Sequence, residues 1–179
     1  MIYLFLAEGF EEVEALCPLD LLRRAGLSVT TVGVGGVQIT GAHGITVKAD
    51  LPDTDYNDDA PDLIFLPGGM PGTLNLAKSP VVERAIRAAV ANNAYLAAIC
   101  AAPSILGDMG LLNGKEAICY PGFEERLTGA VISGKRVVQD GTIITAAGMG
   151  VATEMGLLLV SLLCGKTKAE ELRNAVLAD

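Results

Sequence analysis

The chain alternates short, continuous apolar runs with segments of helical periodicity, and this alternation limits the possible folds more than any other feature. The clearest apolar runs are residues 1–7, 27–33, 62–69 and 95–100. Parallel strands that are buried on both faces have such uninterrupted apolar sequences. Helical patterns between them supply the crossover connections that parallel strands need. The pattern predicts an α/β fold, a three-layer flavodoxin-like sandwich with a mostly parallel central sheet.

Further elements follow from local signals. A helix over 11–25 is expected to bend or break near Pro18, and a helix over 79–91 begins with Pro80. A hairpin is expected around "GAHG" and a strand at 116–119, and the turn signals "SGK" and "QDG" predict antiparallel pairing within 131–147. Helices near 151–164 and 167–177 follow. Because no repeat or linker interrupts the pattern, we expect one domain over 1–179.

Charge and hydropathy exclude several classes of partner. The formal net charge is −8 and no Lys/Arg cluster is present, which argues against nucleic-acid binding. No apolar stretch reaches the length of a membrane span, so no membrane partner is expected. The sequence begins "MIYLFLAEGFEE", without a basic region before its apolar run, and this predicts a cytoplasmic protein without a signal peptide.

The chain has four cysteines without a CxxC pair and a single histidine, His43. This composition predicts reduced thiols, with neither a disulfide framework, nor a metal site, nor a cofactor. Cys17, Cys119 and Cys164 lie within expected helices or strands, and we expect them to be core residues.

Cys100 differs because it lies where an expected strand becomes a helix. Its neighbours Ala98, Ala101 and Ala102 are small, as a tight turn that exposes a nucleophile requires. The following helix N-terminus would lower the pKa of the thiol. The alternative is that Cys100 is a small core residue.

Glu14 falls within the apolar stripe of the first expected helix, which runs through Phe10, Val13, Cys17 and Leu21. A carboxylate that faces the core would have a raised pKa and, when neutral, could donate a hydrogen bond to a thiolate. In the alternative interpretation the helix end frays, and Glu14 reaches water or caps a backbone group.

The "LPGGMPG" segment offers the backbone N–H groups of Gly68 and Gly69, with no side chains in the way. Such a turn can form an oxyanion hole for a carbonyl substrate.

Four segments, "EGFEEVEALCPLDLLRRAG", "DLIFLPGGMPG", "AAICAAP" and "TAAGMG", occur in an order and spacing that resemble the ThiJ/PfpI superfamily. They are most similar to its branch that contains the parkinsonism-associated deglycase. The resemblance implies one class I glutamine amidotransferase-like domain and a homodimer. It also implies that Cys100 is a nucleophilic, easily oxidised thiol, that protonated Glu14 hydrogen-bonds it, and that the Gly69 N–H contributes to the oxyanion site.

The sequence departs from the superfamily pattern at three positions. Ala101 stands where the protease-like branch has a histidine, so a Cys–His pair cannot form there. Tyr120 stands where deglycase-like relatives often have a histidine; it could bind a substrate oxygen but is a poor base at neutral pH. His43 occupies the place of an arginine that approaches the partner subunit, and is either a substitute contact or an exposed loop residue.

Three functions are therefore considered. The first is metal-free processing of α-oxoaldehydes such as methylglyoxal, or repair of glycated proteins, through Cys100 with low turnover. The second is a sensor of oxidative stress or a chaperone that acts through oxidation of Cys100. The third, a cysteine peptidase or amidase, is disfavoured by Ala101 and by the single remote histidine.

Overall fold

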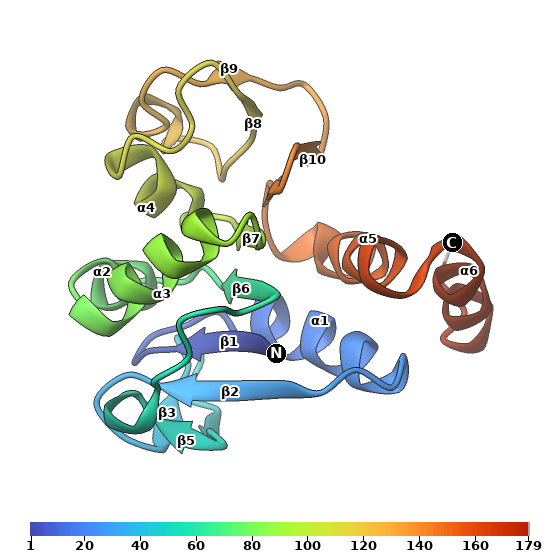
Figure 1. The fold of residues 1–179 in the computed structure, drawn as a ribbon, viewed down its shortest axis with the longest axis horizontal. Helices are drawn as coiled ribbons and strands as arrows, with labels where there is room; N and C mark the ends of the chain where they lie inside the picture. Colours follow the sequence, from blue (N-terminus) through green and yellow to red (C-terminus); the bar gives the residue numbers. More distant parts are fainter. Residues whose placement is uncertain (179) are drawn as a thin grey trace.

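The computed structural model describes residues 1–178, and a seven-stranded sheet forms its centre (Figure 1). The strands run in the order β10-β11-β7-β6-β1-β2-β5, and every neighbouring pair is parallel except β10 with β11. The predicted mostly parallel α/β sheet is confirmed. The strands are β1 (Ile2–Leu6), β2 (Val29–Gly33), β5 (Leu51–Pro52), β6 (Leu63–Leu66), β7 (Tyr95–Ile99), β10 (Val137–Asp140) and β11 (Ile143–Ala146).

Helices cover both faces of this sheet and complete three layers (Figure 1). Side chains of β1 alternate between two cores: Leu4 and Leu6 pack in the cluster that includes α1 and α5, while Phe5 packs in the cluster that includes α3. One face carries α1 (Glu12–Arg24), α5 (Ala152–Cys164) and α6 (Lys166–Ala175), and the other carries α2 (Gly72–Ala77), α3 (Pro80–Ala91) and α4 (Pro103–Asp108).

Two small sheets lie outside the central one. The expected hairpin is present as β3 (Gln38–Thr40) paired with β4 (Thr46–Lys48). The expected pairing across "SGK" is wrong, because β9 (Val131–Ile132) runs parallel to β8 (Glu116–Ala117) instead of pairing with β10. Of the two turns expected within 131–147, only "QDG" joins an antiparallel pair, which is β10 with β11. Single 3₁₀ turns occur at Asp53–Asp55, Glu124–Arg126 and Met149–Val151.

Helix α1 does not break at Pro18 but continues through it. A proline inside a helix removes one backbone hydrogen bond, so its neighbours must hold the helix by other contacts. Here α5 approaches closely at Gly156, where a Cβ atom would lie 2.6 Å from Leu21 Cδ1 and 3.1 Å from Pro18 Cα. Packing against α5 therefore supports α1 at the proline and in the turn that follows it.

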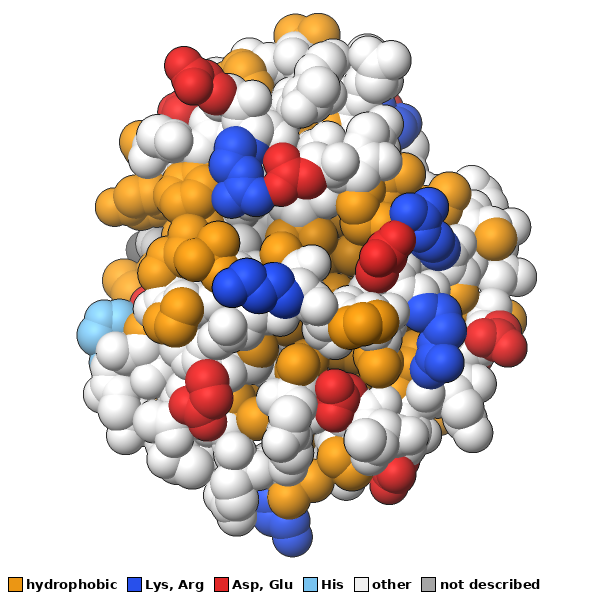
Figure 2. All heavy atoms as spheres, turned by 90° about the vertical axis from the view of Figure 1, so that its left-hand side faces the viewer, with side chains coloured by type: hydrophobic (Ala, Val, Ile, Leu, Met, Phe, Trp, Pro, Cys, Tyr) orange, Lys and Arg blue, Asp and Glu red, His pale blue; other side chains and the backbone are white. Residues whose placement is uncertain are grey.

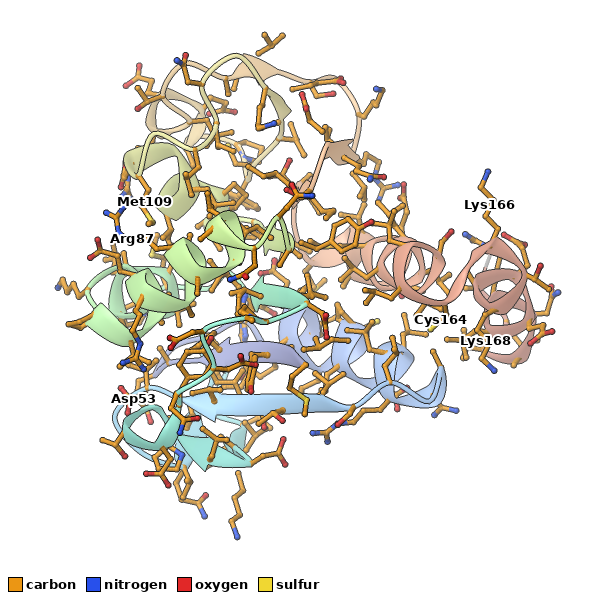
Figure 3. The ribbon with its side chains drawn as sticks, viewed as in Figure 1. Asp53, Arg87, Met109, Cys164, Lys166 and Lys168 are labelled. Carbon is orange, nitrogen blue, oxygen red and sulfur yellow. The ribbon has the colours of Figure 1, made fainter. Side chains whose placement is uncertain are left out.

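Two expectations about burial are wrong. Val13 was placed on the core stripe of α1, but it is 45% exposed. Cys164 is exposed as well, because α5 ends there and the chain turns into the polar start of α6, beside Lys166 and Lys168 (Figure 3). Cys119 is buried as expected, whereas Cys17 is half-buried, with its Sγ 3.3 Å from Thr153 Oγ1.

Over residues 1–178, the helices are all too short or too polar to cross a membrane. Figure 2 shows one face of the molecule, on which Lys/Arg and Asp/Glu side chains are interspersed among apolar ones. This face carries no basic patch of the kind that follows a phosphate backbone.

Candidate active site

Four loops meet beyond the carboxyl ends of β1, β6, β7 and β11, because parallel strands end at the same edge of a sheet. The loops span 7–11, 67–71, 100–102 and 147–150. Backbone hydrogen bonds join them in pairs: Glu11 N–H donates to Gly68 O at 3.0 Å, and Cys100 N–H donates to Ala146 O at 2.9 Å. Residues far apart in the sequence thus form one compact site.

Cys100 occupies the predicted strand-to-helix corner in a left-handed conformation with φ of +65°. A non-glycine residue in this region is uncommon and holds strain that its surroundings must support. The support comes from both sides, since the Cys100 carbonyl also accepts a 2.8 Å hydrogen bond from Tyr120 N–H. The thiol is half-buried, so Cys100 is not a sealed core residue.

Glu14 faces the interior as predicted and is 1% exposed, which removes the alternative of a frayed helix end. Its Oε2 accepts a 3.0 Å hydrogen bond from Gly68 N–H, and the Met149 backbone also donates to the carboxyl group. A Cβ atom placed on Gly68 would lie 2.6 Å from both Glu14 Oε2 and Cys100 Cβ, so the carboxyl group lies beside the Cys100 side chain. The two groups influence each other's pKa.

Burial determines how this pair ionises. It raises the pKa of Glu14 to about 7. Burial first, and the charge of the Glu14 carboxylate second, raise the pKa of Cys100 to about 12, although the Gly69 and Ala101 N–H groups act in the opposite direction. The expected lowering of the thiol pKa is wrong, because α4 has only six residues and its dipole is outweighed. Between these two values the pair holds one proton.

The two glycines of the "PGG" turn have different roles. Gly68 was expected to donate to an oxyanion, but its N–H is occupied by Glu14 Oε2. The N–H groups of Gly69 and Ala101 both favour the anionic form of the Cys100 sulfur, because they act to lower its pKa. They are therefore the donors available to an oxygen that develops charge when the sulfur attacks a carbonyl.

The "PGG" turn is locked against the loop after β1 by contacts between backbones. Gly69 has φ of +89°, and a Cβ atom there would lie 2.3 Å from Glu11 N. A Cβ atom on Gly9 would lie 2.4 Å from Pro71 Cδ, and one on Gly72 would lie 2.6 Å from Phe10 N. The two loops can approach this closely only because these positions have no side chain.

Gly68 allows a direct test of this packing. A Cβ atom there would lie 2.6 Å from both Cys100 Cβ and Glu14 Oε2 and 3.0 Å from Ile99 O. We expect Gly68→Ala to cost about 1–3 kcal/mol in the free energy of unfolding, measured by urea denaturation, because the overlap cannot relax without moving the pair. Gly134→Ala, where no atom lies within 4 Å, is the matched control and should leave stability unchanged.

Tyr120 borders the open side of the site and is 52% exposed. A Cβ atom on Gly148 would lie 3.3 Å from its ring and 3.8 Å from Glu14 Oε1, so the loop after β11 lies against both residues. Gly148 and Met149 belong to "TAAGMG", which was identified only as part of a family pattern, and they were not predicted as site residues. The sequence feature that could have indicated them is a run of small residues after a strand.

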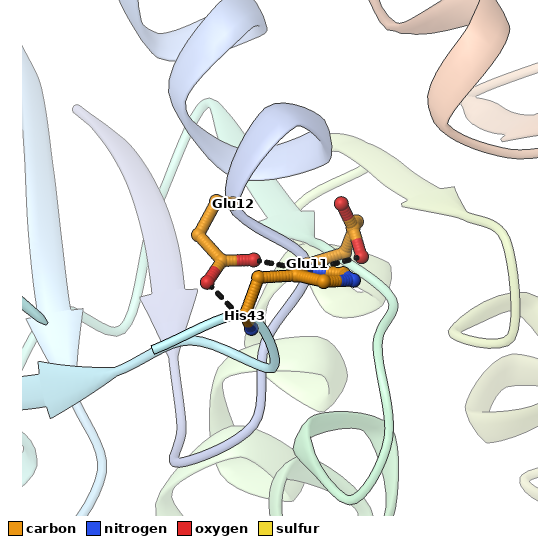
Figure 4. A group of neighbouring side chains, drawn as sticks. All are labelled: Glu11, Glu12 and His43. Carbon is orange, nitrogen blue, oxygen red and sulfur yellow. Dashed lines mark hydrogen bonds and ion pairs between the residues drawn. The ribbon is translucent and has the colours of Figure 1, made fainter. Parts of the chain in front are cut away.

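His43 does not contact the thiol. It lies on the loop between β3 and β4, where its Nδ1 is 2.9 Å from Glu12 Oε2 and 3.4 Å from Glu11 Oε2 (Figure 4). Its side chain is 68% exposed. Glu12, which lies outside the apolar stripe of the first expected helix, is buried beneath this loop. Cys100 therefore has a carboxyl partner, and the chain's single histidine belongs to a separate cluster.

Comparisons with known proteins agree with the resemblance found in the sequence. Protein DJ-1 homolog B of Arabidopsis thaliana is 41% identical over 168 residues, which cover 92% of this chain, and the match spans 38% of the plant protein's length. The glutathione-independent glyoxalase DJR-1.2 of Caenorhabditis elegans is 30% identical, with 92% of this chain and 89% of that protein covered. The crystal structure of Drosophila melanogaster DJ-1beta has a TM-score of 0.93 and 33% identity, and the match covers 99% of this chain and 97% of that one. The model of the DJ-1/PfpI family matches residues 1–162, and the chain belongs to this family.

Proposed function

We propose that the protein converts α-oxoaldehydes such as methylglyoxal into 2-hydroxy acids without glutathione, with Cys100 as the nucleophile and Glu14 as the proton carrier. One observation carries the proposal: a half-buried thiol on a strained corner lies beside a buried carboxyl group, and the N–H groups of Gly69 and Ala101 favour its anion. The relative from Caenorhabditis elegans that is named a glutathione-independent glyoxalase supports the same reaction.

The first step forms a bond between sulfur and the aldehyde carbon. The single proton of the Cys100–Glu14 pair passes to the aldehyde oxygen, which gives a hemithioacetal and leaves Glu14 as a carboxylate. The Gly69 and Ala101 N–H groups stabilise the negative charge that develops on that oxygen.

The second step moves hydrogen between neighbouring carbons. The Glu14 carboxylate takes the proton from the former aldehyde carbon and returns it to the adjacent carbonyl carbon, while a proton passes between the two oxygens. The product is a thioester of the 2-hydroxy acid. Water then cleaves the thioester and regenerates the thiol, so one aldehyde and one water give one acid with no external oxidant.

A pKa near 7 suits Glu14 to this double role, because the group can both give and accept a proton close to neutral pH. The half-buried position of the sulfur would also admit an early glycation adduct on a protein. In such an adduct, the former aldehyde carbon is the atom that the sulfur would attack. Proteins with early glycation adducts are therefore the wider substrate class of this proposal.

The decisive measurement is lactate formation from methylglyoxal by purified protein, followed by NMR in D₂O. Loss of methylglyoxal alone is insufficient, because any thiol adds to it reversibly. We expect lactate to form without glutathione, and its rate to rise with pH through about 7 as Glu14 loses its proton. Absence of lactate at every pH between mild acid and mild base would rule out the proposal.

A further inference from the structure

Glu11, Glu12 and His43 form a second cluster of chemically competent side chains, separate from the thiol (Figure 4). The two carboxylates lie at the start of α1, and the imidazole lies on the loop between β3 and β4, about 30 residues further along the chain. Each residue offers one potential ligand atom, and these atoms all lie within 4.8 Å of one another.

The distances fit the spacing of ligands around a small divalent cation. Ligand bonds of 2.0–2.2 Å in a tetrahedral Zn²⁺ site place neighbouring ligand atoms about 3.3–3.6 Å apart. His43 Nδ1 lies 3.4 Å from Glu11 Oε2 and 2.9 Å from Glu12 Oε2. The first of these distances lies within that range, and the second would have to lengthen by a few tenths of an ångström around an ion.

The charge of the cluster also favours the binding of a cation. The Glu12 side chain is only 5% exposed and that of Glu11 is 16% exposed, so two neighbouring carboxylates are largely removed from water. Buried carboxylates require a compensating positive charge. In the described part of the chain no Lys or Arg forms an ion pair with either one, and their cationic partner is the exposed His43. The hydrogen bond to Glu12 and the charges of both carboxylates raise the pKa of His43, but a protonated imidazole supplies only one positive charge for two carboxylates.

Backbone N–H groups orient the buried Glu12 carboxylate. Glu12 Oε1 accepts hydrogen bonds from the N–H groups of His43 at 2.8 Å and Ile45 at 3.4 Å, while Oε2 lies 2.9 Å from His43 Nδ1. Gly41 makes room for the carboxyl group, because a Cβ atom there would lie 2.3 Å from Glu12 Oε1. Support of this kind around a ligand is typical of metal sites.

We propose that Glu11, Glu12 and His43 bind one divalent cation of the Zn²⁺ type. Glu11 Oε2, Glu12 Oε2 and His43 Nδ1 would supply three ligands, and water would supply the fourth. Imidazole combined with carboxylates suits Zn²⁺ and its neighbours Co²⁺ and Ni²⁺ better than Ca²⁺, which takes six or more oxygen ligands. The ion would bind neutral His43 and replace the hydrogen at Nδ1.

A bound ion would join the start of α1 to the loop after β3. Glu11 also donates its backbone N–H to Gly68 O. One of the residues that bind the ion would therefore be hydrogen-bonded directly to the turn that contributes to the candidate active site. It would stabilise the fold without taking part in the thiol chemistry. The inference therefore stands independently of the proposed function.

The test uses the full chain, freed of metal by a chelator and then titrated with ZnCl₂ by calorimetry and with CoCl₂ by visible absorption. We expect one equivalent of each ion to bind. Co²⁺ should give the visible bands of a low-symmetry four-coordinate site without intense sulfur-to-cobalt charge transfer. His43→Asn, on an exposed loop, should weaken Zn²⁺ binding at least about tenfold, because loss of a ligand should cost no less than loss of a supporting group.

Glu125→Gln is the matched control, since this exposed carboxylate lies outside the cluster and its loss should leave affinity unchanged. Cys100→Ser should also leave the affinity unchanged, whereas loss of binding in that variant would assign the ion to the thiol. Either that result, or absence of saturable binding, or equal affinity in His43→Asn and wild type, would overturn the inference. Glu12→Gln supplies a second ligand variant if His43→Asn alters the loop.

Discussion

Replacing Cys100 by serine should abolish lactate formation from methylglyoxal, with a loss of at least about a thousandfold, because the sulfur atom forms the bond on which every later step depends. Serine has nearly the same size and can occupy the same backbone position, so the free energy of unfolding should change little. The rate of lactate formation, followed by NMR with enzyme in known amount, gives the comparison.

Cys164→Ser provides the matched control, because this thiol is exposed at the end of α5 and lies outside the candidate site. It should retain wild-type activity. If Cys100→Ser retained activity while Cys164→Ser lost it, the assignment of the nucleophile would be wrong. Retention of activity in both variants would show that neither thiol is the nucleophile.

Replacing Glu14 by glutamine should have opposite effects on activity and on stability. Glutamine keeps the shape of the side chain but cannot carry the proton, so lactate formation should fall by about 10²- to 10⁴-fold. Stability should increase above neutral pH, because glutamine never places a negative charge in this buried position.

The pH dependence follows from the raised pKa of Glu14, about 7 in the folded chain compared with 4.5 for a free side chain. Between these values the folded state holds a proton that the unfolded state has lost. Stability from this group is therefore fully present below pH 4.5 and is lost as the pH rises toward 7, by a total of about 3 kcal/mol. Urea denaturation of wild type at pH 5 and pH 7.5 should show this loss, and Glu14→Gln should not.

Glu125→Gln serves as the control for this experiment, since an exposed carboxylate should leave the pH dependence of wild type intact. If Glu14→Gln and wild type lost equal stability between the two pH values, the Glu14 carboxyl group would not be the source of the effect.

The arrangement of strands could be predicted because it depends on continuous apolar sequence. Leu4, Phe5 and Leu6 alternate between two cores, and this requires a continuous apolar run that no polar residue interrupts. The burial of Glu14 was predictable for the same reason, from its place in a helical period. The burial of Cys164 was predicted wrongly because its apolar run extends beyond the point where α5 leaves the core.

The details of the site depend on contacts between distant segments and could not be predicted. Gly68 lost its expected oxyanion role because Glu14, 54 residues earlier, takes its N–H. Glu12 can be buried because N–H groups of a loop more than 30 residues later donate hydrogen bonds to its carboxylate, and no periodicity in α1 indicates those partners. The pKa of Cys100 likewise depends on burial by the whole fold.

The close backbone contacts at Gly9, Gly69, Pro71 and Gly72 determine which positions of the site can change in sequence. The main chain there leaves no space for larger side chains. Under the proposed function, we expect selectivity for one aldehyde over another to be determined at Tyr120 and in the loop around Met149, because both side chains reach solvent. Libraries aimed at new substrates should be concentrated there.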